Sequence, residues 1–384
     1  MSKEDLKEDL KNFKKIWQEK CGKYDITSLP SVLPAVKRII VIGDIHGDWN
    51  MTLKTLRIAK LIDTNNDWIG DDTIVVQVGD QVDRCRYSGV PCNQKGATTP
   101  DEGSDWKILQ YFTKLHKQAM KKGGAVYSLV GNHELMNVNG DFRYVSYDGL
   151  REFDNYKKND GIIIEDGDEA RRWAFAPGND ISEFMACTRQ MSLIIGSNLF
   201  AHAGVLPTIA KKYSVEKLNQ LLSLYLFDML KTSDYTDVFN SSDTSPLWNR
   251  FYGNMGLEKY RQKNPMSDTD EKCDKLLEPI EKIYKVGRIY VGHTPLINHG
   301  IGSVCDDRIW LTDVGMSKAF NKFDNKLNGK SKKYISEKNI FNVYDSTFSD
   351  SSDTGMGSDE ERHGHTRAEV LEILNDGETI NVLK

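Results

Sequence analysis

Short apolar runs rich in β-branched residues alternate along this chain with longer segments of helical periodicity, a pattern typical of an α/β sandwich. Six of the apolar runs end in a cluster of polar residues, where a strand would give way to a loop. These runs are 38–41, 73–78, 125–130, 193–200, 288–291 and 308–312. Because ligands bind beyond the carboxyl ends of strands in open α/β sheets, we expect the six loops to meet at one site.

Two segments between these runs have the periodicity of amphipathic helices. The first repeats apolar residues at intervals of three: Trp106, Leu109, Phe112 and Leu115. The second, 218–229, carries a broad face of leucines. Apolar stripes of this width normally pack on a sheet, so both helices are predicted to cover the core. His116 falls on the polar side of the first helix, which favours a solvated surface histidine over a metal ligand.

The composition divides the chain into four parts. Residues 1–36 precede the first strand and predict an N-terminal helical extension, and residues 37–320 form the predicted catalytic domain. Residues 321–364 are rich in Asn, Lys, Ser, Asp and Gly, which predicts a flexible polar insertion. Two apolar runs in 365–384 flank an Asn-Asp-Gly-Glu turn, so we expect a C-terminal β-hairpin that completes the catalytic domain.

The charge of the chain limits its expected partners. A formal net charge of −5 and a pI near 6.0 give no general basic surface, so neither nucleic acid nor an anionic membrane is an expected partner. No apolar run approaches the roughly 18 residues that span a bilayer.

The six cysteines are scattered without a CxxC pair, which predicts reduced thiols and a cytoplasmic location. Cys85 and Cys92 lie seven residues apart in a loop beside one of the motifs. Two interpretations stay open for this pair: a reversible disulfide that tunes activity, or two ordinary loop cysteines. The second is favoured in a reducing compartment.

The polar clusters offer the donors of a site with two metal ions. Asp44 and His46 lie two positions apart after the first run, so their side chains can point the same way. The other candidate residues follow later runs: Asp80, Asn132, His133, His202 and His293. Two cations roughly 3.5–4 Å apart polarise a phosphoryl group and lower the pKa of a shared water. Mixed Asp, Asn and His ligation suits Mn, Fe or Zn, with Mn as the first expectation.

Five motifs, in this order, resemble those of the phosphoprotein phosphatase branch of the calcineurin-like metallophosphoesterases. They are GDIHG at 43–47, GDQVDR at 79–84, GNHE at 131–134, AHAG at 201–204 and VGHT at 291–294. SPLWNRFYG at 245–253 and DVGMS at 313–317 look more like the bacterial-type Shewanella-like phosphatases than the common eukaryotic Ser/Thr enzymes. The resemblance implies a β-sandwich of two mixed sheets flanked by helices, with the site on strand-end loops.

The resemblance also implies two sets of metal ligands. The first metal would be held by Asp44, His46 and a bridging Asp80. The second would be held by Asp80, Asn132, His202 and His293.

The remaining roles carried over from the family concern the substrate. His133 would be the general acid, oriented by Asp83, because a carboxylate sustains the imidazolium form. Arg84 would bind phosphate oxygens in bidentate fashion. Arg250 is the candidate for the second phosphate-binding arginine, although its motif differs from that of the common Ser/Thr enzymes. Attack would come directly from metal-bound hydroxide, without a phosphoenzyme.

These motifs favour a phosphoprotein phosphatase acting on phospho-Ser, phospho-Thr or phospho-Tyr, without fixing which of the three. A dinucleoside-polyphosphate or nucleotide hydrolase is the alternative enzyme, since related metal cores cleave phosphoanhydrides. An inactive binding scaffold is a further alternative, which the complete ligand set disfavours. The expected partner is a phosphorylated protein or peptide, and the sequence identifies no regulatory subunit.

Overall fold

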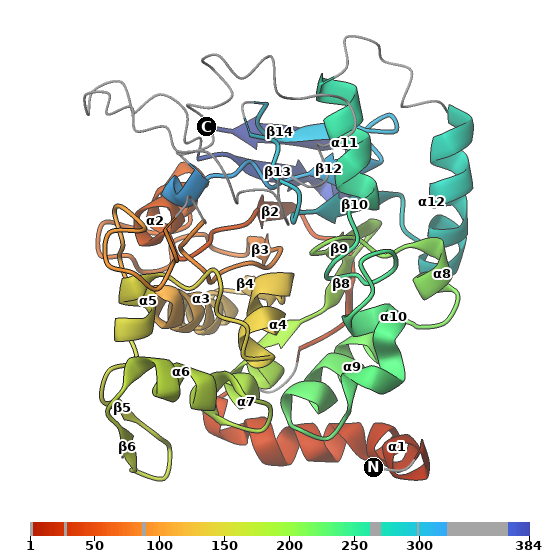
Figure 1. Cartoon of the computed structure of the whole chain (residues 1–384). Helices are drawn as coiled ribbons and strands as arrows, with labels where there is room; N and C mark the ends of the chain where they lie inside the picture. Colours follow the sequence, from red (N-terminus) through yellow and green to blue (C-terminus); the bar gives the residue numbers. More distant parts are fainter. Residues whose placement is uncertain (1–2, 27–28, 87–89, 262–269, 298, 321–367) are drawn as a thin grey trace, which may run out of the picture.

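Two mixed β-sheets packed face to face form the centre of the described part of the molecule, and helices cover both outer faces (Figure 1). The computed structural model describes residues 3–26, 29–86, 90–261, 270–297, 299–320 and 368–384. The predicted α/β sandwich of two mixed sheets is confirmed. The predicted insertion at 321–364 lies outside the described residues.

The first sheet has the strand order β14-β13-β2-β3-β4-β7. Its strands are β2 (Arg38–Ile42), β3 (Ile74–Gln77), β4 (Ala125–Leu129), β7 (Arg189–Gln190), β13 (Val370–Leu374) and β14 (Thr379–Leu383). Strands β2, β3, β4 and β7 are parallel, so their carboxyl ends lie at one edge of the sheet. The hairpin of β13 and β14 pairs antiparallel with β2, so the end of the chain extends this sheet.

The second sheet has the strand order β1-β8-β9-β10-β12-β11. Its strands are β1 (Val32–Leu33), β8 (Ser192–Ile195), β9 (Asn198–Ala201), β10 (Arg288–Val291), β11 (Gly302–Val304) and β12 (Ile309–Leu311). Strands β9, β10 and β12 are mutually parallel, whereas β8 and β9 are antiparallel.

The run 193–200, expected as one strand, is therefore two strands joined by a tight turn. Gly196 has a φ of 56°, which glycine adopts at no steric cost, and the chain reverses there. The Asp376 carboxylate accepts hydrogen bonds from the Ser197 backbone N–H (2.9 Å) and from the Asn198 side chain (2.7 Å). An aspartate from the far end of the chain thus stabilises the turn, which local periodicity does not reveal.

Alternation along the strands separates the hydrophobic layers. On β2, Ile39 and Val41 face the second sheet and pack with Phe200 and Tyr290. Ile40 and Ile42 point to the opposite side, where they join residues of α2 (Trp49–Ile58) and α3 (Asp105–Met120). Both faces of the parallel strands are buried, and for that reason these strands read as continuous apolar runs.

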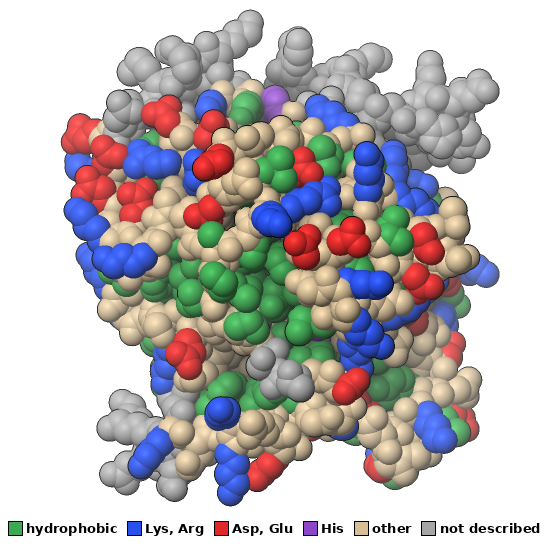
Figure 2. All heavy atoms as spheres, turned by 180° about the vertical axis from the view of Figure 1, so that it is seen from behind, with side chains coloured by type: hydrophobic (Ala, Val, Ile, Leu, Met, Phe, Trp, Pro, Cys, Tyr) green, Lys and Arg blue, Asp and Glu red, His purple; other side chains and the backbone are tan. Residues whose placement is uncertain are grey.

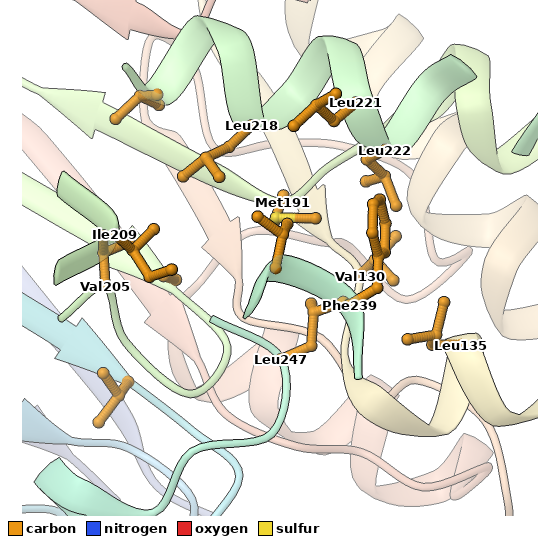
Figure 3. Close-up of a cluster of buried hydrophobic side chains, with 14 of the residues drawn as sticks. Val130, Leu135, Met191, Val205, Ile209, Leu218, Leu221, Leu222, Phe239 and Leu247 are labelled. Atoms are coloured by element: carbon orange, nitrogen blue, oxygen red, sulfur yellow. The ribbon is translucent and has the colours of Figure 1, made fainter. Parts of the chain in front are cut away.

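Helices α9 (Val215–Leu226) and α11 (Phe251–Arg261) pack on the outer face of the second sheet, and α12 (Asp270–Tyr284) joins the same hydrophobic cluster. Figure 3 shows Leu218, Leu221 and Leu222 of α9 pointing at Met191 and its neighbours. The other α-helices of the described residues are α1 (Lys3–Cys21), α4 (Asn132–Val138), α5 (Tyr147–Arg151), α6 (Gly167–Phe175), α7 (Asp180–Thr188), α8 (Pro207–Ala210) and α10 (Thr236–Phe239). Strands β5 (Tyr156–Lys157) and β6 (Ile163–Ile164) form a separate hairpin.

His116 corrects one expectation about α3. Its side chain is 6% exposed, and Nδ1 lies 2.9 Å from the carbonyl oxygen of Val126 on β4. The prediction of a solvated surface histidine was wrong, because α3 also packs its histidine side against β4. The role of this residue is structural: it satisfies a strand carbonyl.

All six cysteines form disulfides, which corrects the prediction of reduced thiols. The pairs are Cys21–Cys187, Cys85–Cys92 and Cys273–Cys305, separated by 166, 7 and 32 residues in sequence. Two of these pairs join distant segments, so their pairing depends on the fold and not on spacing. Three disulfides are more typical of an oxidising compartment, and the argument from cysteines for a cytoplasmic location therefore falls away.

The surface carries intermingled charges. On the face shown in Figure 2, basic and acidic side chains alternate around a central area of hydrophobic side chains. Within the described residues, none of the helices combines the length and the apolar character that crossing a membrane requires.

The Cys21–Cys187 bond ties the N-terminal helix to α7, and its loss should destabilise the fold. Replacing both cysteines with alanine should lower the free energy of unfolding by about 2–5 kcal/mol, because the unfolded chain loses its longest cross-link. Urea unfolding followed by circular dichroism measures this change.

The matched control is the double replacement of Cys85 and Cys92, which should cost less because that bond closes a much shorter loop. Equal stability of the wild type and the Cys21/Cys187 double variant would contradict the assignment.

Candidate metal centre

Loops from both sheets meet at the carboxyl ends of the parallel strands. Asp44 and His46 follow β2, Asp80 follows β3, and Asn132 begins α4 directly after β4. The second sheet contributes His202 after β9 and His293 after β10. All six side chains are at most 5% exposed. The structure therefore brings together the residues that the sequence predicts as metal ligands.

Asp80 lies between two groups of potential ligands. Its Oδ2 atom is 3.8 Å from His46 Nε2 and 3.9 Å from His133 Nε2. Its Oδ1 atom is 3.4 Å from His202 Nε2, and the donor atoms of Asp80, His202 and His293 lie within 4.8 Å of one another. Each oxygen of one carboxylate thus faces a different group, which is the arrangement that a bridging ligand needs.

Asp44 and Asn132 complete the two groups. Asp44 Oδ2 lies 4.0 Å from His46 Nε2, on the side of the first group. Asn132 Oδ1 lies 2.9 Å from His202 Nε2, on the side of the second. His202 Nδ1 is 2.9 Å from the carbonyl oxygen of Val78, a contact that orients its Nε2 toward Asn132.

The backbone of the site adopts left-handed conformations that non-glycine residues seldom occupy. The φ angles are 47° at His46, 52° at Asp80, 73° at Asp83 and 67° at His293. Each such residue costs about 1–3 kcal/mol and persists where the surrounding structure holds it in place. Strain of this kind clusters at functional sites, and here it falls on residues of the predicted centre.

Two glycines allow the ligand loops to approach each other. A Cβ atom on Gly292 would lie 2.1 Å from Asp44 Oδ1, and a Cβ atom on Gly131 would lie 2.1 Å from Asp80 Oδ1. Both distances are far below van der Waals contact. The glycines that precede Asn132 and His293 are therefore required by the position of the carboxylates.

Glu134 fixes the loop that carries Asp80, a role that the sequence alone did not assign. Its Oε2 accepts hydrogen bonds from the backbone N–H groups of Asp80 (3.0 Å) and Gly131 (2.6 Å). Its Oε1 accepts from the N–H groups of Gln81 (2.7 Å) and Val82 (3.2 Å). Four backbone donors on one carboxylate hold the two loops in register.

His133 and Asp83 form a close pair beside this centre. His133 Nδ1 is 2.6 Å from Asp83 Oδ2, and the Asn137 side chain donates to Asp83 Oδ1 at 2.8 Å. Arg171, which is fully buried, donates to Asn137 Oδ1 (2.9 Å) and to Asp105 Oδ2 (2.8 Å). This network orients the Asp83 carboxylate, and no sequence motif points to Asn137 or Arg171.

The electrostatics of the site fit bound cations. Burial, together with neighbouring Asp313 and Asp80, raises the pKa of Asp44 well above its usual value. Burial likewise raises the pKa of Asp313 to about 6, and its Oδ2 atom has no hydrogen-bond partner among the described residues. Burial lowers the pKa of His46 and of His293, so both imidazoles are neutral and can donate a lone pair. Buried carboxylates with neutral imidazoles are the donor set that transition metals favour.

The two predicted phosphate-binding arginines lie in different surroundings. Arg250 Nη1 donates to the carbonyl oxygen of His293 at 2.9 Å, at the edge of the second group. Arg84 is 1% exposed, and its Nη1 atom donates to Ser317 Oγ at 2.7 Å. Its Nη1 atom also lies 3.2 Å from Asp48 Oδ2, whereas Nε and Nη2 have no hydrogen-bond partner among the described residues. A third arginine, Arg86, lies outside the five motifs, and its Nη2 atom is 2.7 Å from His46 Nε2.

This protein has a sandwich of two sheets, and His and Asp side chains cluster on its strand-end loops. That combination is the architecture of a metallophosphoesterase. The chain belongs to the calcineurin-like phosphoesterase family, whose model matches residues 37–296. It is therefore a hydrolase of the phosphoesterase type, in a family that depends on a dinuclear metal centre.

The relatives support the resemblance to Shewanella-like phosphatases. Shewanella-like protein phosphatase 2 of Arabidopsis thaliana is 30% identical over 314 residues, covering 73% of this chain and 72% of the relative. An uncharacterised protein of Acanthamoeba polyphaga mimivirus is 37% identical over 237 residues, covering 56% and 90%. Among solved structures, the cold-active protein-tyrosine phosphatase of a psychrophilic Shewanella species has a TM-score of 0.56 at 19% identity, covering 93% and 83%. This last likeness concerns the fold.

A substitution at Gly292 should disturb the metal centre without removing a ligand. In Gly292→Ala the new methyl group would push the Asp44 carboxylate aside, so the purified protein should retain markedly less metal than the wild type. Elemental analysis after dialysis against a metal-free buffer measures the metal content.

Gly287→Ala is the matched control, because a Cβ atom at Gly287 meets nothing within 4 Å. Its metal content should equal that of the wild type. Full metal content in Gly292→Ala would show that Asp44 does not need its present position.

Proposed function

We propose that the chain is a metal-dependent phosphatase that hydrolyses phosphate monoesters on proteins or peptides, at phospho-Ser, phospho-Thr or phospho-Tyr. The observation that carries this proposal is the His133–Asp83 pair at 2.6 Å, with His133 Nε2 only 3.9 Å from the carboxylate shared by both ligand groups. A proton donor of this kind, next to a two-metal ligand set, suits protonation of a leaving alkoxide or phenoxide.

The ligand groups suit two transition-metal ions. Asp44, His46 and Asp80 would hold one, and a second would be held by Asp80 with three further residues: Asn132, His202 and His293. When bound, the pair of ions would polarise the phosphoryl group and lower the pKa of a water molecule. Manganese is our first choice, with iron or zinc as alternatives that fit the same mixed donors.

His133 and Asp83 supply the proton chemistry in this proposal. His133 Nδ1 is hydrogen-bonded to Asp83, so Nε2 points toward the centre. From Nε2, the imidazolium gives a proton to the leaving oxygen of the substrate. Asn137 holds the second oxygen of Asp83, so the imidazole keeps its orientation as its charge changes. The proton on Nε2 is then replenished from solvent.

The choice of a protein substrate is supported by the relatives. Proteins of Arabidopsis thaliana and Plasmodium berghei that are 30% identical to this chain are named Shewanella-like protein phosphatases. Arg250, next to His293, offers a guanidinium to phosphate oxygens at the edge of the site.

The proposal predicts metal-dependent hydrolysis of an aryl phosphate monoester. Protein stripped of metal should be inactive, and addition of Mn²⁺ should restore turnover. Asp80→Asn should stay inactive under both conditions, because the proposed bridging ligand loses its negative charge. Circular dichroism of the variant controls for folding.

The choice of substrate is then tested on the active protein. We expect faster hydrolysis of phosphopeptides than of a dinucleoside tetraphosphate. Strong preference for the tetraphosphate would replace the proposal by a nucleotide hydrolase, and absence of turnover with any divalent metal would replace it by a binding scaffold.

His133→Asn tests the proton donor separately from the metals. Turnover of a phosphoserine peptide should fall by about 10²-fold or more, because general acid catalysis contributes on that order. Metal content should stay near that of the wild type, since His133 is not among the proposed ligands.

His299→Asn is the matched control, an exposed histidine whose ring stacks on Tyr260 of α11. Its turnover should equal that of the wild type. Unchanged turnover in His133→Asn would remove this residue from the role of general acid.

A further inference from the structure

Arg171 of α6 is a fully buried cation beside Asp83, the partner of His133. Its side chain is 0% exposed, and Nη2 donates to Asp105 Oδ2 at 2.8 Å and lies 3.7 Å from Asp83 Oδ1. Asp105 Oδ2 also accepts from the Asp83 backbone N–H at 3.1 Å. One guanidinium thus compensates two buried carboxylates, and the same ion pair fixes the backbone of Asp83.

The side-chain amide of Asn137 joins Arg171 to Asp83. Arg171 Nε donates to Asn137 Oδ1 at 2.9 Å. Because a guanidinium has donors only, the atom that it contacts must be the amide oxygen. The amide nitrogen is thereby turned the other way, where it donates to Asp83 Oδ1 (2.8 Å) and to the carbonyl oxygen of His133 (2.9 Å). Arg171 therefore determines which end of the amide faces Asp83.

The orientation of this amide matters for the His133 ring. With the opposite orientation, the amide oxygen would face Asp83 Oδ1, and two acceptors would meet without a proton between them. Asp83 would then lose a donor that holds its carboxylate. Since Asp83 Oδ2 lies 2.6 Å from His133 Nδ1, any turn of the carboxylate moves the hydrogen-bond partner of the imidazole.

The surroundings of Arg171 keep its guanidinium in one position. Nη1 donates to the carbonyl oxygen of Gly149 in α5 at 3.0 Å. The Cζ atom lies 5.0 Å from the ring centroid of Phe175 and 5.3 Å from that of Phe153, and both rings are buried. Aromatic contacts of this kind fix the plane of a guanidinium while leaving its N–H groups available for hydrogen bonds.

We propose that Arg171 is a positioning residue for proton transfer, which aligns His133 Nε2 with the leaving oxygen of the substrate through Asn137 and Asp83. The inference rests on the proposed phosphatase function and deepens it. In this step one proton passes from the imidazolium to the leaving oxygen as the P–O bond breaks, and the imidazole becomes neutral. Substrates whose leaving group needs this proton least should depend least on Arg171.

Two monoesters with different leaving groups test the proposal. The alkoxide of a phosphoserine peptide needs the proton, whereas the phenolate of p-nitrophenyl phosphate is a stable anion that needs it far less. Arg171→Met should lower kcat for the phosphopeptide by about 10-fold, which is part of the full effect of a general acid. It should lower kcat for p-nitrophenyl phosphate by a much smaller factor. Because both rates come from one sample, any loss of folded protein cancels in their ratio.

Asn137→Ala is a second variant, which removes the amide and keeps the buried ion pair of Arg171. It should change the ratio of the two rates in the same direction. In a His133→Asn background, Arg171→Met should leave the ratio unaltered, because the residue through which it acts is already absent. A further change of the ratio in that background would overturn the proposal.

Arg189→Met is the matched control. Arg189 is 1% exposed and donates to the carbonyl oxygen of Leu109 in α3, so its replacement also removes a buried guanidinium. This variant should be less stable than the wild type but should keep the wild-type ratio of the two rates. An equal change of the ratio in Arg189→Met and Arg171→Met would show a general effect of lost packing and would overturn the proposal.

A readout that needs no turnover separates this inference from the function on which it rests. The proton in the hydrogen bond between His133 Nδ1 and Asp83 should give a downfield NMR resonance, absent in His133→Asn. The resonance should shift or broaden in Arg171→Met and stay unchanged in Arg189→Met. This response in a wild type that hydrolyses no monoester would refute the phosphatase function alone. An active wild type with the same ratio and resonance in Arg171→Met would refute the role of Arg171 alone.

Discussion

The arrangement of the whole site depends on the hydrogen bonds made by one residue, Asp80. Its backbone oxygen accepts from the N–H groups of Ile45 (3.0 Å) and His46 (2.9 Å), which fixes the loop after β2. Its backbone N–H donates to Glu134, and its Oδ1 accepts from the His133 N–H at 2.9 Å, which fixes the start of α4. One strand end thus holds both neighbouring loops, and the strained φ of Asp80 is maintained by these bonds.

This constraint gathers negative charge that the folded protein does not neutralise well by itself. Asp44, Asp80 and Asp313 are all buried within one small region, and the raised pKa values of Asp44 and Asp313 express the cost of ionising them there. A divalent cation relieves that cost, whereas a hydrophobic core would exclude such groups altogether. The buried carboxylates therefore destabilise the metal-free protein, and the same carboxylates favour the binding of a cation.

Sequence periodicity predicted the elements of this fold because both faces of its central strands are buried. Continuous apolar runs located β2, β3 and β4, and the polar residues after them proved to share one edge of the sheet. Features that depend on distant contacts could not be derived in this way. The turn at Gly196 needs Asp376, and Cys21 meets Cys187 only after α1 packs on α7.

Side-chain direction after a motif is a further property that the motif letters do not determine. Asp83 has a φ of 73°. The direction of the Arg84 side chain that follows then depends on the groups with which it can form hydrogen bonds and ion pairs. Asp48, Glu102 and Ser317 come from three separate segments and together draw Arg84 inward. The Nε and Nη2 atoms of Arg84 keep no hydrogen-bond partner among the described residues, and the Arg86 guanidinium lies between the aromatic rings of Tyr144 and Phe320, beside His46. The loop after β3 thus carries two arginines in different surroundings, and the motif letters alone do not determine which partners each one meets.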